Sequence, residues 1–366
     1  MSFENNSTVE KVKELNRKLR ARHGKTYRDK FTVHYKGDDF MQLAFASKGC
    51  ESAKKGTCVM CNGFGPVKEV ASPEQVRQIT RENYEKHYPR QVLLDTSGSV
   101  LNFDEYPKEN LEAVLGSLSE YKTLEKVFIE THFQTITQEK IDLVRKLLGS
   151  EIAVGFELGF ESAQEDVRTL AIAKGEDLTN DAFKNTLKLI NNNNMTATVN
   201  VLCGAPFLSE REQFVDAVKS IKFCFENGAD DVVFFPVNIR PNTVIGELYK
   251  TGKYPQPSIW TYLAVLGAFD QKHLARIHPA WYGNKDTSEY VDDKGFTEAK
   301  SIMPRDYEKA IGVISEYSAN PNQRRKILTN FMETSSEYQV WRGKLGHIPK
   351  NEIPLGKRVE EGYNGL

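Results

Sequence analysis

The feature that most constrains the fold is a repeat, beginning at residue 39, in which short apolar or β-branched runs alternate with amphipathic helical patterns. Such strand–helix units build a parallel sheet covered by helices. We expect strands at six runs, 39–46, 91–96, 126–131, 151–158, 197–203 and 231–238. We expect helices at about 73–88, 107–121, 137–149, 180–193, 209–227 and 257–275. Six units are too few for an eightfold barrel, so the sequence predicts an α/β fold, a partial (β/α)6 barrel.

Both ends of the chain differ from this repeat. Residues 8–22 read as a charged helix, and nine Lys and Arg residues lie between positions 11 and 30. A solvated helix flank explains them better than a nucleic-acid-binding arm. The last 90 residues read as two helices followed by a polar, loop-like tail from residue 348. We expect three parts, an N-terminal helical extension 1–38, the barrel 39–275, and a C-terminal helical extension and tail 276–366.

Composition limits the function classes. The net charge of −1 gives no general basic field for nucleic acid, and no apolar run approaches membrane-spanning length. The first residues hold no apolar stretch typical of a secretory signal, and five cysteines in 366 residues do not make a disulfide framework. We expect a cytoplasmic protein.

Three of the cysteines lie in one glycine- and lysine-rich loop after the first strand, Cys50, Cys58 and Cys61, spaced C-x7-C-x2-C. Structural zinc needs four closed ligands, and the loop holds no fourth Cys or His. A redox dithiol needs only two cysteines, and a glycine-rich loop is a poor place for three unconnected buried thiols. A [4Fe–4S] cluster with three protein ligands leaves one iron open, which can chelate S-adenosylmethionine (SAM). We favour the cluster because spacing, ligand number and fold agree.

The chain resembles the radical SAM superfamily at this point. The commonest spacing there is C-x3-C-x2-C, and the longer loop with KGC…GTCVMC is similar to the archaeosine synthase radical SAM subunit, a relative of the radical SAM domain of the Elongator catalytic subunit. The segments TSGSVLNFDEYP, FIETHF, GFELGFESAQEDVRTLAIAKG, APFLSEREQFVDAVKSI and NIRPNTVIGELYKTGKYPQPSIW continue the match in order. The resemblance covers roughly residues 40–265, which is more specific than one motif.

The resemblance implies roles for residues at the strand ends. Cys50, Cys58 and Cys61 would ligate iron. SAM would be bound by residues at the ends of the second, fourth, fifth and sixth strands, namely Ser97, Gly98, Ser99, Glu157, Glu161, Ser162, Lys174, Gly204, Pro206 and Asn238. A simple Ser-Gly turn is the alternative for residues 97–98, and a surface lysine is the alternative for Lys174.

Three further residues are candidates for catalysis. Glu130 and His132 end the third strand, where the related pattern carries arginine near the histidine position. Arg240 follows the sixth strand and either clamps a carboxylate or phosphate or forms a surface ion pair. Cys203 and Cys224 stand alone, and we interpret them as inert core thiols.

The resemblance implies an enzyme, of lyase or oxidoreductase type, with a [4Fe–4S] cluster and SAM as cofactors. SAM would be cleaved reductively to a 5′-deoxyadenosyl radical, which abstracts hydrogen from a small amino-acid- or nucleoside-derived substrate. The alternative is archaeosine-type modification, in which a lysine adduct on a deazaguanine base of tRNA is cleaved. Two other classes stay open: a non-catalytic metal-binding protein on the same barrel, and an RNA-binding module that uses the basic N-terminal helix. A flavodoxin- or ferredoxin-type electron donor and oxygen sensitivity follow from the radical SAM interpretation.

Overall fold

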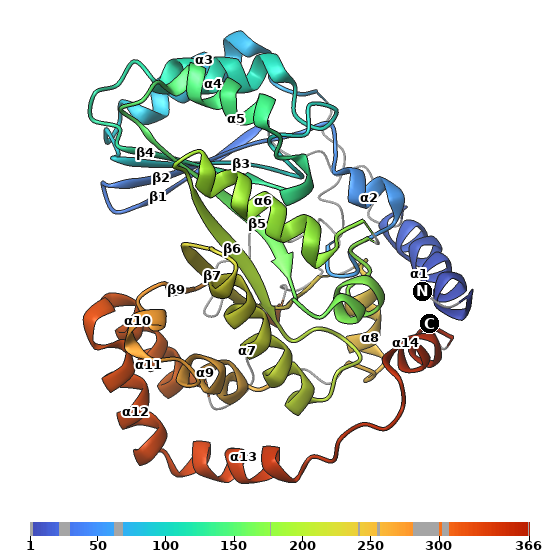
Figure 1. Cartoon of the computed structure of the whole chain (residues 1–366). Coiled ribbons are helices and arrows are strands. Elements are labelled where there is room, and N and C mark those ends of the chain that lie inside the picture. Colours follow the sequence, from blue (N-terminus) through green and yellow to red (C-terminus); the bar gives the residue numbers. More distant parts are fainter. Residues whose placement is uncertain are drawn as a thin grey trace.

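The computed structural model describes residues 3–21, 30–61, 69–175, 177–240, 242–254, 257–280, 300–301, 307–364 and 366. At its centre is a curled sheet in the order β1-β2-β3-β4-β5-β6-β7-β9, with helices over its outer face (Figure 1). The strands from β2 to β7, and then β9, run parallel, and β1 pairs antiparallel with β2 at the edge. The predicted partial barrel is therefore confirmed.

The strands of the main sheet are β1 Phe31–Lys36, β2 Phe40–Phe45, β3 Gln91–Thr96, β4 Lys126–Thr131, β5 Ala153–Glu161, β6 Thr196–Cys203, β7 Asp231–Pro236 and β9 Ile277–Pro279. A second small sheet pairs β8 Asn238–Ile239 with β10 Lys300–Ser301. All six predicted strand runs coincide with β2 to β7.

The helices of the repeat are α3 Pro73–Tyr84, α4 Lys108–Leu118, α5 Gln138–Leu148, α6 Asn180–Asn192, α7 Glu210–Glu226, α8 Val244–Lys250, α9 Ile259–Gly267 and α10 Gln271–Leu274. Short turns of helix lie at α2 Glu51–Lys55, η1 Phe133–Thr135 and η2 Val167–Ala171. The ends of the chain form α1 Phe3–Ala21, α11 Tyr307–Ala319, η4 Pro321–Gln323, α12 Arg324–Thr334, α13 Ser336–His347 and α14 Leu355–Tyr363.

Local sequence signals explain where the repeat helices begin. Ser72 and Ser209 each cap a helix, and the side chain three residues later returns a bond to the cap in a capping box. The single predicted helix at 257–275 is instead two helices, because a new cap at Asp270 starts α10 after α9 has ended.

Two strands of the main sheet were not predicted. β1 has the sequence FTVHYK and is largely exposed at the sheet edge, so it carries no continuous apolar run. β9 is only three residues long, and its position is fixed by pairing with β7 and not by its composition. Both lie outside the 39–275 range and extend the sheet on either side.

The prediction of a loop-like tail is wrong for residues 355–363, which form α14. Val359 and Tyr363 are buried, and the Arg358 guanidinium donates to both carboxylate oxygens of Glu212 on α7 at 2.9 and 3.0 Å. α14 packs against α1 and η2, so the two ends of the chain lie side by side (Figure 1). This tertiary contact orders a segment whose own sequence is mostly polar.

The C-terminal helices pack beside the barrel. Glu210 at the start of α7 accepts hydrogen bonds from the Thr261 hydroxyl at 2.5 Å and from the Trp341 indole at 3.1 Å, which ties α13 to α9 and the barrel. Among the described residues, no helix is both long and apolar enough to cross a membrane.

Candidate functional site

The cysteine loop begins where β2 ends, at the C-terminal edge of the parallel strands. Cys50 precedes α2, Gly56 ends that helix with φ +79°, and Cys58 has φ +64°. All three cysteines are half-buried free thiols. Burial raises the pKa of Cys58 to about 12, which the nearby charges of Lys174 and Arg20 partly oppose. The side chains of Cys50 and Cys58 both lie within electrostatic range of Cys61.

The loop is fastened to the turn that follows η2. The Cys58 and Val59 amides donate to the carbonyls of Ala173 and Ile172 at 2.7 and 2.9 Å. The next residue in that turn, Lys174, therefore lies beside the cysteines, although 113 or more residues of chain separate it from them. The strand order of the barrel alone brings these segments together.

Gly98, in the loop that follows β3, lies against the cysteine loop. Its φ is +148°, and a Cβ there would lie 2.1 Å from Oε2 of Glu105 and 3.4 Å from the Cα of Cys50. Only glycine fits, because the backbone approaches both neighbours closely. The Ser97 carbonyl accepts from the Ser47 hydroxyl at 2.8 Å. The Ser99 hydroxyl is buried and is shared with Thr131 and Thr135, at 2.5 and 3.0 Å.

Glu105 is a central residue of this site that the sequence analysis missed. Its side chain is fully buried, and its carboxylate accepts from the Glu51 amide at 2.7 Å and the Ser99 amide at 2.6 Å. The carboxylate thereby joins the first turn of α2 to the loop after β3. In the sequence it follows Asp104 in a loop, where a solvated acid is the usual expectation.

A row of polar side chains crosses the inner face of the sheet, and we call it the polar row: Gln42, Asp95, Glu130, Glu157 and Asn200 on β2 to β6. The Gln42 amide donates to Asp95 at 2.9 Å. Glu130 hydrogen-bonds to Asp95, and Glu157 hydrogen-bonds to Asn200. The register places Glu130 directly opposite Glu157, whereas Gln42 and Asn200 each lie two residues out of register with the side chain they contact.

Two carboxyls of the polar row, those of Glu130 and Glu157, hold protons more tightly than isolated acids do. Burial, followed by the charges of Asp95 and Glu157, raises the pKa of Glu130 well above its ordinary value. Burial also raises the pKa of Glu157 to about 7, while the hydrogen bond from Asn200 opposes the shift. While protonated, each of these two carboxyls can donate a hydrogen bond. Each can also release its proton when a positively charged ligand binds beside it.

We expect the pH dependence of stability to report Glu157. The folded state keeps its proton up to about pH 7, whereas the unfolded chain releases it near the ordinary value of 4.5, so stability falls as pH rises between these values. Relative to wild type, Glu157→Gln should gain on the order of 2 kcal/mol in the free energy of unfolding between pH 4.5 and 8. Urea titrations across this range measure the effect, with the exposed Glu139→Gln as control. Parallel pH profiles for wild type and Glu157→Gln would contradict it.

His132 lies in the same region as a neutral group. Burial and the charge of Lys174 lower the pKa of His132 to about 4. Its amide donates to the Ser99 hydroxyl at 3.1 Å. At neutral pH the imidazole can therefore accept or donate a hydrogen bond, but it is not a cationic acid.

The end of β5 supplies a buried ion pair. Lys174 donates to Oε1 of Glu161, and both residues are less than 10% exposed, so the surface-lysine alternative for Lys174 is wrong. The strand persists to Glu161, with a register shift after Gly159 and a φ of +68° at Glu161. A Cβ at Gly159 would lie 2.9 Å from Nζ of Lys174, so glycine leaves room for the pair. Oε2 of Glu161 is buried without a hydrogen-bond partner.

Other predicted residues are placed less centrally. The Ser162 hydroxyl is buried and donates to Asp216 of α7 at 2.6 Å. Gly204 has φ +102°, and its carbonyl accepts from the Tyr254 hydroxyl at 2.5 Å. Pro206 is buried in the loop that follows. Arg240 lies directly after β8, and its carbonyl accepts from Thr243 at 2.6 Å.

The remaining residues that the sequence analysis singled out are Asn238, Cys203 and Cys224. The side chain of Asn238 lies outside the part of the chain that the structure describes. Cys203 and Cys224 are fully buried, and burial raises the pKa of each thiol, so the structure places both in the core.

The three cysteines fit an iron–sulfur cluster, because cysteine thiolates are the ligands that such clusters require. Cys50, Cys58 and Cys61 are three half-buried free thiols on one loop, and a thiol that binds metal is deprotonated outright. Within the described residues, no three His, Cys, Asp or Glu side chains gather closely enough to hold a metal ion. A cubane distributes its ligands over separate irons, so the three sulfurs need not converge on one point. The orphaned Oε2 of Glu161 marks a polar group beside the loop that still lacks a partner.

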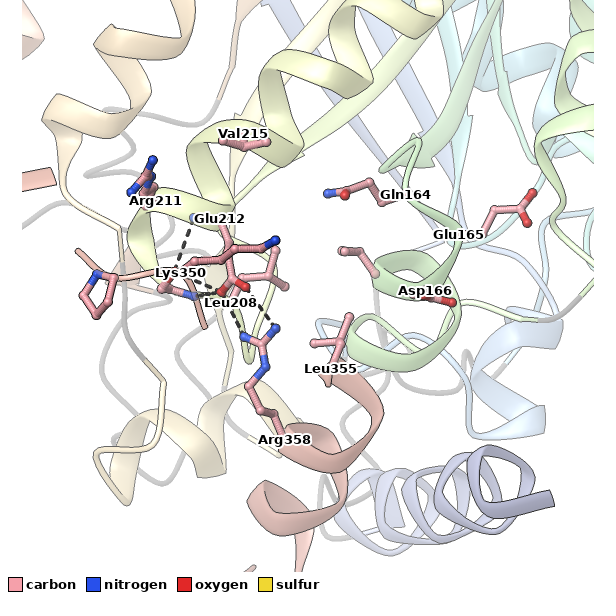
Figure 2. A pocket seen from close by; sticks show the side chains of 13 residues that line it. Gln164, Glu165, Asp166, Leu208, Arg211, Glu212, Val215, Lys350, Leu355 and Arg358 are labelled. Atoms are coloured by element: carbon pink, nitrogen blue, oxygen red, sulfur yellow. Dashed lines mark hydrogen bonds and ion pairs between the residues drawn. The ribbon is translucent and has the colours of Figure 1, made fainter. Parts of the chain in front are cut away.

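A separate cavity of about 660 Å³ lies outside the barrel, between η2, α7 and α14. Figure 2 shows Glu165 and Asp166 on one wall and Arg211, Lys350 and Arg358 on the opposite side. Its described lining residues include none of those that the sequence analysis selected. The cavity is therefore distinct from the site at the strand ends.

Two curated proteins are similar to this chain in sequence. An uncharacterised protein of Methanocaldococcus jannaschii is 28% identical over 329 residues, which cover 86% of this chain and 84% of that protein. Archaeosine synthase subunit beta of Methanosarcina acetivorans is 28% identical over 235 residues, which cover 62% of this chain and 65% of that subunit. The matched part is thus less than two thirds of the subunit's own length.

Solved structures resemble the chain more distantly. Methanocaldococcus infernus Elp3 with an N-terminal deletion has a TM-score of 0.46 and 16% identity, covering 68% of this chain and 59% of that one. Methylornithine synthase has a TM-score of 0.42 and 12% identity, covering 80% of this chain and 84% of that one. No protein-family model matches the chain. The resemblance to the archaeosine synthase subunit that the motifs predict is confirmed by the sequence similarity to the Methanosarcina acetivorans protein of that name.

Proposed function

We propose that this chain is a radical SAM enzyme whose Cys50, Cys58 and Cys61 hold a [4Fe–4S] cluster. When bound, the cluster supplies an electron that cleaves SAM to a 5′-deoxyadenosyl radical, which abstracts hydrogen from the substrate. The observation that carries the proposal is the position of the three free thiols at the C-terminal end of the first parallel strand of a partial barrel. Parallel β/α folds concentrate their chemistry at this end.

The residues around the loop suit a cationic ligand. SAM carries a sulfonium and an ammonium group, and the inner face of the sheet presents Asp95, Glu130 and Glu157. Glu161, with its unpartnered oxygen, lies close enough to Cys58 for its charge to raise the pKa of that thiol. These carboxyls can bind and orient positive charge.

We propose a small amino-acid- or nucleoside-derived substrate. A site lined by acidic side chains suits an amine-bearing small molecule better than a polyanionic backbone, and the net charge of −1 adds no long-range attraction for nucleic acid. The radical would lead to fragmentation, rearrangement or dehydrogenation of that substrate.

One observation favours a second candidate. The similarity to a protein named archaeosine synthase subunit beta supports tRNA modification by radical cleavage of a lysine adduct on a deazaguanine base. The two candidates share the radical chemistry and differ only in the molecule that enters the barrel. A low-potential flavodoxin or ferredoxin would supply the electron in either case.

We expect anaerobic reconstitution with iron and sulfide to give about four irons per chain. With SAM and dithionite, the protein should then release 5′-deoxyadenosine, whereas the Cys50→Ala/Cys58→Ala/Cys61→Ala variant should release none. Cys224→Ala, which removes a core thiol on α7, is the matched control and should retain the activity. A chain that binds zinc and never cleaves SAM would be a non-catalytic metal-binding protein. Free amino acids, nucleosides and tRNA, compared as accelerators of SAM cleavage, separate the two substrate classes.

A further inference from the structure

The N-terminal helix α1 contacts the cysteine loop through its last turns. Arg20 lies in the final turn of α1, and its guanidinium reaches across to the loop. It donates hydrogen bonds to the main-chain carbonyls of four loop residues, Ala53 at 2.9 Å, Thr57 at 2.6 Å, Cys58 at 2.7 Å and Cys61 at 2.8 and 3.1 Å. Two of these carbonyls belong to cysteines that we assign to the cluster.

Neighbouring side chains of α1 extend the contact. The Asn16 amide, which is fully buried, donates to the Gly56 carbonyl at 2.9 Å. The exposed Arg17 donates a single bond to the Lys55 carbonyl at 3.1 Å. The carbonyls of Lys55 and Gly56 lie at the end of α2, beyond its helical hydrogen bonds, and α1 supplies donors to both of them.

The backbones of the two segments also approach closely. A Cβ at Gly56 would lie 2.3 Å from the Lys13 carbonyl oxygen, in addition to the positive φ at this position. The loop therefore fits under α1 only with glycine at residue 56. This contact is independent of the hydrogen bonds from Arg20.

The opposite side of the loop is held by the turn after η2, which accepts from the Cys58 and Val59 amides. α1 thus holds the carbonyl side of the loop, and the turn holds the amide side. Cys58 keeps a left-handed backbone, φ +64°, between these two supports. A non-glycine residue adopts that conformation at a cost, which surrounding contacts must offset.

We propose that Arg20 is a positioning residue of the cluster site, which holds Cys58 and Cys61 in the conformation that binds iron. The basic N-terminal segment is then a working part of the metal site and not a solvated flank. A planar guanidinium can donate to several carbonyls in fixed directions, which an ammonium cannot do. The inference rests on the proposed function for its metal, but the support of the loop itself can be measured on the apoprotein.

The test compares Arg20→Ala, Arg20→Lys and the matched control Arg17→Ala. On the apoprotein, the rate at which an alkylating reagent modifies each cysteine is followed by mass spectrometry. We expect Cys58 and Cys61 of Arg20→Ala to react about tenfold faster than in wild type or more, because the loop opens locally. Arg17→Ala removes one exposed hydrogen bond to the Lys55 carbonyl and should stay within about twofold of the wild-type rates, and the rates of Arg20→Lys should lie between those of wild type and Arg20→Ala. Circular dichroism and thermal unfolding establish that each variant is folded.

The same proteins are then reconstituted anaerobically, and the iron retained under a chelator is measured. Arg20→Ala should lose its iron several times faster than Arg17→Ala. If a folded Arg20→Ala protein shows wild-type alkylation rates and wild-type iron retention, the proposal is overturned. If the wild type takes up no iron while the alkylation contrast persists, the proposed function fails and the support of the loop by Arg20 stands. If Arg20→Ala does not fold, Arg20→Lys is compared with Arg17→Ala. Equal alkylation rates and equal iron retention in these two variants would then overturn the proposal.

Discussion

Replacing Glu105 with alanine is expected to lower the free energy of unfolding by about 3 to 5 kcal/mol. The carboxylate is fully buried and accepts from the Glu51 and Ser99 amides and from the Asn102 side chain. Removing it leaves buried main-chain donors without a partner and opens a cavity beside Gly98. Burial raises the pKa of Glu105, but these hydrogen bonds oppose the shift. The role of the carboxylate is therefore to accept hydrogen bonds from the surrounding loops.

Urea unfolding measures the loss, and hydrogen exchange at the Glu51 and Ser99 amides locates it. The matched control is Asp104→Ala, which removes the exposed neighbouring acid and should change stability by less than about 0.5 kcal/mol. Glu105→Gln should also be destabilising, because its amide group turns a donor toward one of the two main-chain amides. An alanine variant as stable as wild type, with unchanged exchange at both amides, would show that the carboxylate does not hold the two loops together.

The second large effect that we expect is a loss of stability when Lys174, the cation of the buried ion pair, is removed. In Lys174→Met, the carboxylate of Glu161 stays less than 10% exposed and loses the partner of Oε1, while Oε2 already has none. An unpaired buried charge costs about 3 to 5 kcal/mol of stability. The double variant Lys174→Met/Glu161→Gln removes the charge as well and should recover a large part of that loss.

His132 gives an independent readout of the same change. Burial is the main cause that lowers the pKa of His132 to about 4, and the charge of Lys174 is the second. In Lys174→Met, an NMR titration should therefore show the pKa of His132 rising but remaining below its ordinary value of 6.5. Equal stability of the single and double variants would mean that Glu161 does not need its partner. An unmoved His132 titration would mean that Lys174 does not act on the imidazole.

Sequence periodicity was sufficient to locate the barrel. Each of the six predicted strand runs is a strand, because a parallel strand covered by helices must be apolar along most of its length. The repeat helices began near their predicted positions where a Ser or Thr cap marks the start, as at Ser72 and Ser209. The edge strand β1 lacked this signal because its side chains are exposed.

A signal for the role of α1 was present in the sequence and was not recognised. Val9, Val12, Asn16 and Leu19 are all buried and follow the helical period, so Asn16 occupies a position on the apolar stripe of the helix. A polar residue at such a position needs a buried partner, which is the Gly56 carbonyl. Arg20 follows directly on that stripe and contacts the same loop.

The sequence by itself determined which units repeat, at which end of the strands the candidate residues lie, and which three cysteines share a loop. These are local properties, set by periodicity, capping and spacing within a few tens of residues. Only the tertiary structure decided that Glu105 joins two loops, that Lys174 is buried against Glu161 beside the cysteines, and that α1 supports the loop from the other side. A charged residue in a loop is normally solvated, and its burial becomes favourable only when distant segments bring its partners into hydrogen-bond reach.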